Sequence, residues 1–133
     1  MLAYTHSLDQ PRLKPVVLNE LVQHSEHVDL NSMLLPMLAA LSQRASWLVM
    51  LEPPKSLNKS LLREAGVDLN KVWILRRDHR HGIDKLAQRA LMAGTCHTLI
   101  CWQNRHDDNT LVEQLKRTHI ASDTQCLLIR SEH

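Results

Sequence analysis

The stretch Ser46-Trp47-Leu48-Val49-Met50-Leu51-Glu52-Pro53 decides the fold class. Its apolar residues follow one another almost without interruption, which is typical of a strand covered on both faces. Pro53 ends the run, because proline cannot donate a hydrogen bond to a strand ladder. Residues 72–75 (VWIL) and 97–102 (HTLICW) are runs of the same kind. We therefore expect three buried strands, near Trp47, Trp73 and Ile100, at the centre of one sheet.

Segments with apolar residues at helical spacing lie between these runs. A ragged strand at 16–22 and a last strand at 126–129 complete an alternating βαβαβαβαβ order, which predicts right-handed crossovers. The fold class expected is α/β: a three-layer α/β/α sandwich with a mostly parallel sheet. Asn31 or Ser32 is expected to cap the first helix and Asp84 the third. The apolar positions are Leu34, Leu35, Leu38 and Leu41; Leu57, Leu61, Leu62 and Ala65; Ile83, Leu86, Ala87, Ala90 and Leu91; and Leu111, Val112 and Leu115.

The 133 residues fit one domain. We expect a flexible N-terminal tail at 1–15, a single α/β domain at 16–130 and a mobile C-terminal tail at 131–133. No apolar stretch approaches the ~20 residues of a membrane-spanning helix, and the first residues lack the pattern of a signal peptide. A cytoplasmic protein with no membrane partner is expected. Its three cysteines, Cys96, Cys101 and Cys126, are then reduced thiols that behave as small apolar residues.

The charge balance points to no particular partner. Sixteen basic and 14 acidic residues give a net charge of +2, whereas a nucleic-acid binder of this size is usually more basic. Phenylalanine is absent and the single tyrosine is Tyr4, so aromatic platforms for single strands are scarce. We expect no nucleic-acid partner.

Sites for enzyme chemistry are also scarce. A phosphate loop needs glycines that let backbone N–H groups surround the anion, and the chain has only Gly66, Gly82 and Gly94. No nucleotide-binding motif is present, and we expect neither a catalytic site, nor a resident cofactor, nor a metal. The alternative is a metal-dependent or nucleotide-handling enzyme that uses His79 and His81 with Asp78 or Asp84. Three arginines around these residues oppose binding of a dication, which favours a solvated basic loop.

The three tryptophans are candidates for an interaction surface, because tryptophan is prominent in interface hot spots. Trp47, Trp73 and Trp102 all fall in strand runs. The alternative is that all three pack between sheet and helices. We interpret Trp73 as a core residue and Trp102 as the tryptophan most exposed to solvent.

The order of several motifs resembles the SulA family of cell-division inhibitors. The resemblance is carried by 34–38 (LLPML), 46–53 (SWLVMLEP), 69–72 (LNKV), 87–94 (AQRALMAG) and 100–102 (ICW), and it covers residues 33–103. It implies a RecA-like fold without the nucleotide site. Leu51 and Lys71 match positions that the family ties to inhibition. Ser46 stands where the family has a basic residue, and Leu61 where it has a tryptophan.

The resemblance also implies a function. Members of the family are made in the SOS response to DNA damage and bind FtsZ, the tubulin-like division GTPase. Binding blocks polymerisation and GTPase activity and halts septum formation until the Lon protease degrades the inhibitor. We expect Leu51, Lys71, Trp47 and Leu61 to contact the partner, and we leave a homodimer open.

Overall fold

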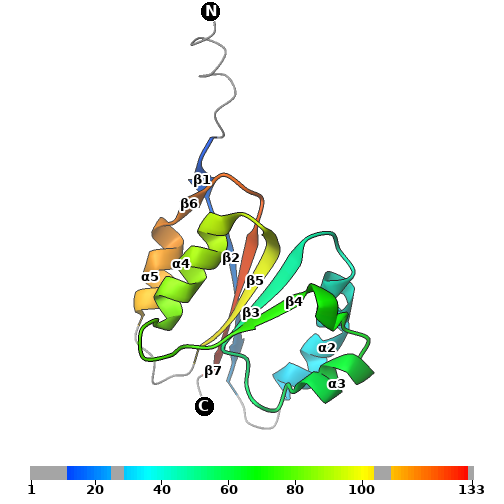
Figure 1. Cartoon of the computed structure of the whole chain (residues 1–133). Helices are drawn as coiled ribbons and strands as arrows, with labels where there is room; N and C mark the ends of the chain where they lie inside the picture. The colour runs from blue at the N-terminus through cyan, green and yellow to red at the C-terminus, as the bar shows by residue number, and fades with distance from the viewer. Residues whose placement is uncertain (1–11, 25–28, 104–108, 132–133) are drawn as a thin grey trace, which may run out of the picture.

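The structure is a computed structural model that describes residues 12–24, 29–103 and 109–131. A five-stranded parallel sheet lies between two pairs of helices (Figure 1). The strands occur in the order β2-β7-β5-β3-β4, and every neighbouring pair is parallel. The α/β fold class and the three layers are confirmed. The strands are β2 (Val17–Gln23), β3 (Trp47–Leu51), β4 (Val72–Leu75), β5 (Cys96–Gln103) and β7 (Gln125–Ser131).

The helices are α2 (Leu30–Ser42), α3 (Lys59–Glu64), α4 (Ile83–Ala93) and α5 (Thr110–Arg117), with a 3₁₀ helix, η1, at Leu69–Lys71. Figure 1 shows α4 and α5 on one side of the sheet and α2 and α3 on the other. Successive residues of β3 serve the two sides alternately, as a pleated strand requires. Val49 and Leu51 pack in the core on the α4/α5 side, and Leu48 and Met50 pack in the core on the α2/α3 side. None of the helices in the described ranges is long and apolar enough to cross a bilayer.

The helix ends differ slightly from those expected. Asp29, rather than Asn31 or Ser32, caps α2: its side chain accepts a hydrogen bond from the backbone N–H of Ser32 at 3.2 Å. Gly82 occupies the N-cap position of α4, and Asp84 lies in the first turn, where a negative charge favours the helix dipole. These shifts are of one or two residues, the usual uncertainty at helix ends.

Two short strands were not expected from the sequence. β1 (Lys14–Pro15) pairs antiparallel with β6 (His119–Ile120), and Lys14 forms an ion pair with Asp123. The end of the segment assigned to the N-terminal tail is therefore attached to the domain, while residues 1–11 lie outside the described part. Ser131, assigned to the C-terminal tail, is the last residue of β7, and Glu132 and His133 also lie outside the described part.

The predicted position of one strand was wrong. β4 is an edge strand that pairs only with β3 within the described sheet, whereas β3 and β5 lie inside it as expected. Trp73 of β4 is 50% exposed and Trp102 of β5 only 9%, which reverses the interpretation of these two side chains. An apolar run four residues long does not reveal whether a further strand lies beside it.

Candidate partner-binding surface

Helix α4 covers the neighbouring strands more fully than it covers the edge strand β4. Helix α4 packs on β5 and β3, and β4 lies at the end of the strand order beside β3. Trp73 is directed to the same side of the sheet as Leu75, which packs on the α4/α5 core. Half of the Trp73 side chain is therefore open to solvent, although tryptophan is a large apolar residue. An exposed tryptophan on a free sheet edge is a typical feature of an interaction surface.

A second tryptophan supports Trp73. The ring of Trp47, the first residue of β3, lies 5.0 Å from that of Trp73 between centroids, with an interplanar angle of 40°. Trp47 is partly buried against the α4/α5 core. Tilted aromatic pairs at this separation are favourable by about 0.5–1.5 kcal/mol beyond the area they bury. The contact restricts the exposed ring, so a partner would meet a largely preorganised apolar surface.

An apolar cavity adjoins the pair. It has a volume of about 260 Å³ and lies between β4 and α4, with Trp73 on one wall and Leu86 and Ala90 on the other. Leu75 and Val49 also line it, and Arg89 is the one charged residue among the described residues that do. The cavity has room for an apolar side chain next to a cation.

Lys71 lies at the same end of the sheet. Lys71 ends η1, and Leu48 pairs with Val72, so Lys71 and Trp47 occupy adjacent positions at the amino ends of β3 and β4. The backbone around η1 is well fixed. The N–H of Asp68 donates to Ser42 Oγ at 2.9 Å, and the Asp68 carbonyl oxygen accepts from the N–H of Lys71 at 3.0 Å. Among the described residues no carboxylate forms an ion pair with Lys71, which leaves its charge for a partner.

The structure separates the other two expected contact residues from this corner. Leu51 is completely buried in the α4/α5 core at the carboxyl end of β3, about 13 Å along the strand from Trp47. Leu61 is partly buried and packs from α3 against the core on the opposite side, although α3 itself contacts η1. Trp47 and Lys71 therefore lie together, Leu61 lies on a neighbouring element, and Leu51 lies in the core.

Trp73 was one of the three tryptophans considered for an interaction surface, but it was interpreted as a core residue, whereas it lies half exposed on this surface. The sequence does contain a signal that β4 is an edge strand. The run at 72–75 is short and is followed at once by Arg76 and Arg77, and short strands flanked by charges are common at sheet edges.

The histidine-rich loop after β4 is organised by hydrogen bonds within the loop. Asp78 Oδ1 accepts from the backbone N–H of Arg80 at 2.8 Å and of His81 at 2.7 Å, and these bonds lower the pKa of Asp78. His81 Nδ1 lies 3.3 Å from the same oxygen, and its Nε2 lies 3.2 Å from Arg89 Nη1. His79 is exposed. No three His, Cys, Asp or Glu side chains in the described ranges are placed to hold one metal ion.

The cysteines do not form a nucleophilic site. Cys96, Cys101 and Cys126 are all free and buried. The pKa of Cys101 is raised, first by its contact with the Cys126 thiol and then by burial, so the thiol form is favoured. A catalytic cysteine would need the opposite shift, because the thiolate is the nucleophile.

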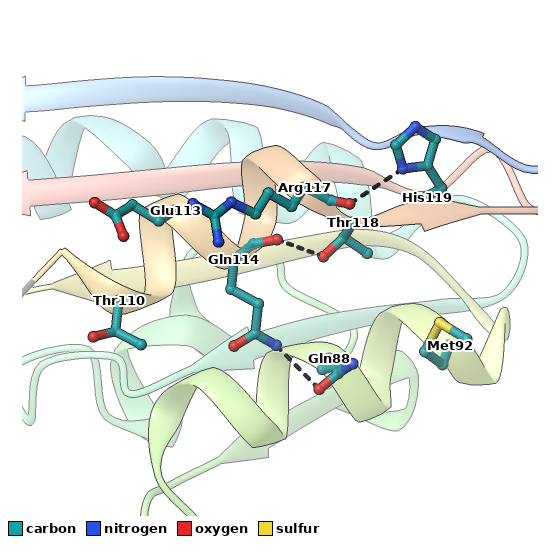
Figure 2. Close-up of a pocket in the computed structure, with 8 residues that line it drawn as sticks. All are labelled: Gln88, Met92, Thr110, Glu113, Gln114, Arg117, Thr118 and His119. Carbon is teal, nitrogen blue, oxygen red and sulfur yellow. Dashed lines mark hydrogen bonds between the residues drawn. The ribbon is translucent and has the colours of Figure 1, made fainter.

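A larger surface pocket, of about 500 Å³, lies between α4 and α5 (Figure 2). Several of its polar groups form hydrogen bonds across or within the helices. Gln114 Nε2 donates to Gln88 Oε1 at 3.1 Å, and Thr118 Oγ1 donates to the Gln114 carbonyl oxygen at 2.6 Å (Figure 2). His119 Nδ1 lies 3.1 Å from the carbonyl oxygen of Arg117. Gln88, Gln114 and Thr118 are thus paired within the pocket, and the apolar surface around Trp73 is the better candidate for contact with a partner.

Comparison with known proteins gives one consistent family. Residues 16–126 match the model of the family described as "Cell division inhibitor SulA". Proteins named cell division inhibitor SulA from Yersinia pestis and Yersinia pseudotuberculosis are 29% identical over 86 residues, or 65% of this chain and 51% of the relative. The chain thus spans about half the length of these curated relatives. The crystal structure of SulA from Pseudomonas aeruginosa is 28% identical with a TM-score of 0.72, and the match covers 89% of this chain and all of that one.

Proposed function

Because the chain belongs to the SulA family of cell division inhibitors, we propose that it halts septum formation by binding FtsZ. The proposal places the protein in the cytoplasm, made in the SOS response to DNA damage. Binding would block both polymerisation and GTPase activity. FtsZ subunits stack head to tail, and a loop of one subunit completes the GTPase site of the next. A protein that covers this face inhibits both activities without chemistry of its own.

The observation that supports this proposal best is the exposed Trp73, which lies against Trp47 at the edge of the described sheet near Lys71. The aromatic pair supplies apolar contact in the centre of an interface, where most binding energy is concentrated. Lys71 supplies a charge that would face carboxylates of FtsZ. Such charges act mainly on the association rate and its salt dependence, and buried apolar contacts act mainly on dissociation.

Leu51 and Leu61 belong to the proposal in a different way. Leu51 is completely buried, so its effect on inhibition would pass through the packing of β3 under Trp47 and Trp73. Leu61 is partly buried on α3, which contacts η1 and so borders the Lys71 corner. Both residues are proposed to shape the surface, whereas Trp47, Trp73 and Lys71 form it.

The test is inhibition of purified FtsZ from the same organism, followed by sedimentation of polymers and by phosphate release. Inhibition should be stoichiometric, appearing as the inhibitor concentration approaches that of FtsZ. Trp73→Ala and Lys71→Glu should each shift the inhibition curve to higher concentration. Matched controls are Met33→Ala, which removes a side chain 67% exposed on α2, and Lys116→Glu on the exposed face of α5. Wild-type protein that leaves both FtsZ activities unchanged at excess inhibitor would refute the proposal.

Turnover by the Lon protease is part of the same proposal. β7 ends at Ser131, and residues 132 and 133 follow it in the sequence. A variant lacking residues 132 and 133 should persist longer in cells than the full chain. If the full chain and the shortened variant have equal half-lives in cells that contain Lon, the proposed role of these residues in turnover is refuted.

A further inference from the structure

The carboxyl ends of all five parallel strands open onto another cavity, at the opposite end of β3 from Trp47. Its volume is about 440 Å³, within the range of small-molecule sites. Gln23 and Ser131 end two of the strands, Glu52 and Arg76 follow two others, and Gln103 ends β5; all five line the cavity. In open α/β sheets, ligands bind in the crevice outside the carboxyl ends of the strands.

The cavity carries an excess of positive charge. Lys55, Arg76, Arg77 and Arg130 line it, and among the described residues that line it Glu52 is the only acidic one. Glu20, outside the lining, lies 3.5 Å from Arg130 between Oε2 and Nη1. Counted over the described residues alone, these two carboxylates offset two of the four cations and leave an excess of two positive charges. An anionic ligand with about two negative charges would neutralise the site.

The rim of the cavity is held in place by bonds between two loops. Arg76 Nη1 donates to the carbonyl oxygen of Pro53 at 2.8 Å, and Glu52 Oε1 accepts from the backbone N–H of Arg77 at 2.5 Å. Glu52 has a φ of 57°, in the left-handed region that non-glycine residues seldom adopt. Backbone strain of this kind is concentrated at binding sites. The loop after β3 is thereby tied to the loop after β4, with the arginines on the cavity side.

The remaining walls are partly apolar and also fixed. Trp102 Nε1 donates to Asn31 Oδ1 at 3.1 Å, and both residues line the cavity. Pro53 and Pro54 form the wall after β3 and have no N–H to offer an anion. The charged donors available to an anion on these walls are therefore the side-chain cations. This explains how an anion site can exist without the glycine-rich loop that the sequence lacks.

We propose that this cavity binds a small phosphate-bearing molecule, with the phosphate held by Arg76, Lys55 and Arg130. A phosphate monoester carries between one and two negative charges near neutral pH, which matches the excess charge. Guanidinium groups bind phosphate oxygens through paired, charge-assisted hydrogen bonds. The apolar walls formed by Trp102 and the prolines would contact the body of the molecule. The site is distinct from the surface around Trp73 and does not depend on the proposed function.

The test uses the indole N–H signals of the three tryptophans in ¹H–¹⁵N spectra, with Trp102→Phe to assign the signal at the cavity. Inorganic phosphate and glycerol phosphate are titrated in turn at constant ionic strength. The Trp102 signal should shift and saturate, while those of Trp47 and Trp73 should not. Tighter binding of glycerol phosphate would identify a phosphate ester as the ligand, and equal binding would identify free phosphate.

Arg76→Gln should raise the Kd at least about tenfold, the usual effect of losing a charged hydrogen-bond partner. Arg117→Gln, on α5, removes an arginine outside the cavity and should leave the Kd unchanged. Lys55→Gln, at an exposed lysine with little role in folding, should weaken binding as well and serves if Arg76→Gln is unstable. A shift that does not saturate, or saturable binding that survives both Arg76→Gln and Lys55→Gln, would overturn the proposal.

Discussion

Strands β4 and β5 look alike in sequence, each a short apolar run with one tryptophan, yet they occupy opposite environments. β5 lies between β3 and β7 and is buried along almost its whole length, with Trp102 bonded to Asn31. β4 lies at the edge of the described sheet, and Trp73 is half exposed with its ring against that of Trp47. The comparison shows that position in the sheet, rather than the composition of a run, decides whether an aromatic residue stabilises the fold or presents a surface.

The largest contrast is expected in stability. Trp102→Ala should lower the free energy of unfolding by about 3–5 kcal/mol, because it leaves a cavity in the core and an unpaired Asn31 side chain. Trp73→Ala should cost about 1–1.5 kcal/mol, since half of the ring is already in water and the contact with Trp47 is the main loss. Urea unfolding followed by circular dichroism measures both. Equal losses would mean that the edge and the centre of the sheet are not different environments.

The next prediction concerns Leu51, which lies in the core beside the edge strand. Leu51→Ala should lower the free energy of unfolding by about 2–5 kcal/mol, the usual range for a buried leucine. If its role is packing alone, the fraction that remains folded should inhibit FtsZ nearly as well as the wild type. Inhibition should be compared at 10 °C and normalised to the folded fraction. A variant that is as stable as the wild type but inactive would show instead that Leu51 contacts the partner.

The order of elements could be predicted from the sequence, because it depends on local patterns. Alternating apolar runs and helical spacings predicted the five strands of the main sheet and the four α-helices of the described residues, and Gly94, with a φ of 68°, follows α4 where expected. Strand order depends on which apolar runs pair with one another, and these runs lie far apart in the sequence. For that reason Trp73 and Trp102 were interpreted the wrong way round. The strands β1 and β6 are two residues long and leave no periodic signal.

The candidate surface was only partly predictable for the same reason. Lys71 and Trp47 were named individually, but the pairing of Leu48 with Val72 is what places them side by side. Leu51 was placed correctly at the end of its strand, but a strand position alone does not show that a residue is completely buried. The resemblance to a family carried the functional hypothesis, and the sheet topology assigned the residues to surface or core.

Substitutions at the edge should act on binding more than on stability. Trp73→Ala and Lys71→Glu should each weaken FtsZ binding by about 2 kcal/mol, roughly thirtyfold in Kd. The two should differ in salt dependence: added salt should weaken the wild type toward the Lys71→Glu variant, whereas Trp73→Ala should keep the wild-type slope. Binding is measured by fluorescence anisotropy of labelled inhibitor. A folded Lys71→Glu variant that binds FtsZ as tightly as the wild type would exclude the Lys71 corner from the FtsZ-binding surface.

The smallest effect is a dependence of stability on pH that arises in β5 itself. His97 is partly buried near the start of β5; its Nδ1 lies 2.8 Å from Thr98 Oγ1, and its Nε2 is buried without a hydrogen-bond partner in the described structure. Burial lowers the pKa of His97, and the nearby charge of Arg44 lowers it further. In the unfolded chain the pKa returns to about 6.5. Between the two pKa values the unfolded state binds more protons, so the free energy of unfolding falls as the pH drops through this window and is at its full value above it.

His97→Asn should remove this contribution and flatten the stability profile between pH 7 and pH 5, relative to the wild type. His119→Asn is the matched control: its side chain is exposed beside α5, so the slope should stay that of the wild type. Both profiles are measured by urea unfolding at intervals of half a pH unit. If His97→Asn keeps the full slope, the acid sensitivity arises elsewhere, and the environment of β5 does not act on the titration of its own histidine.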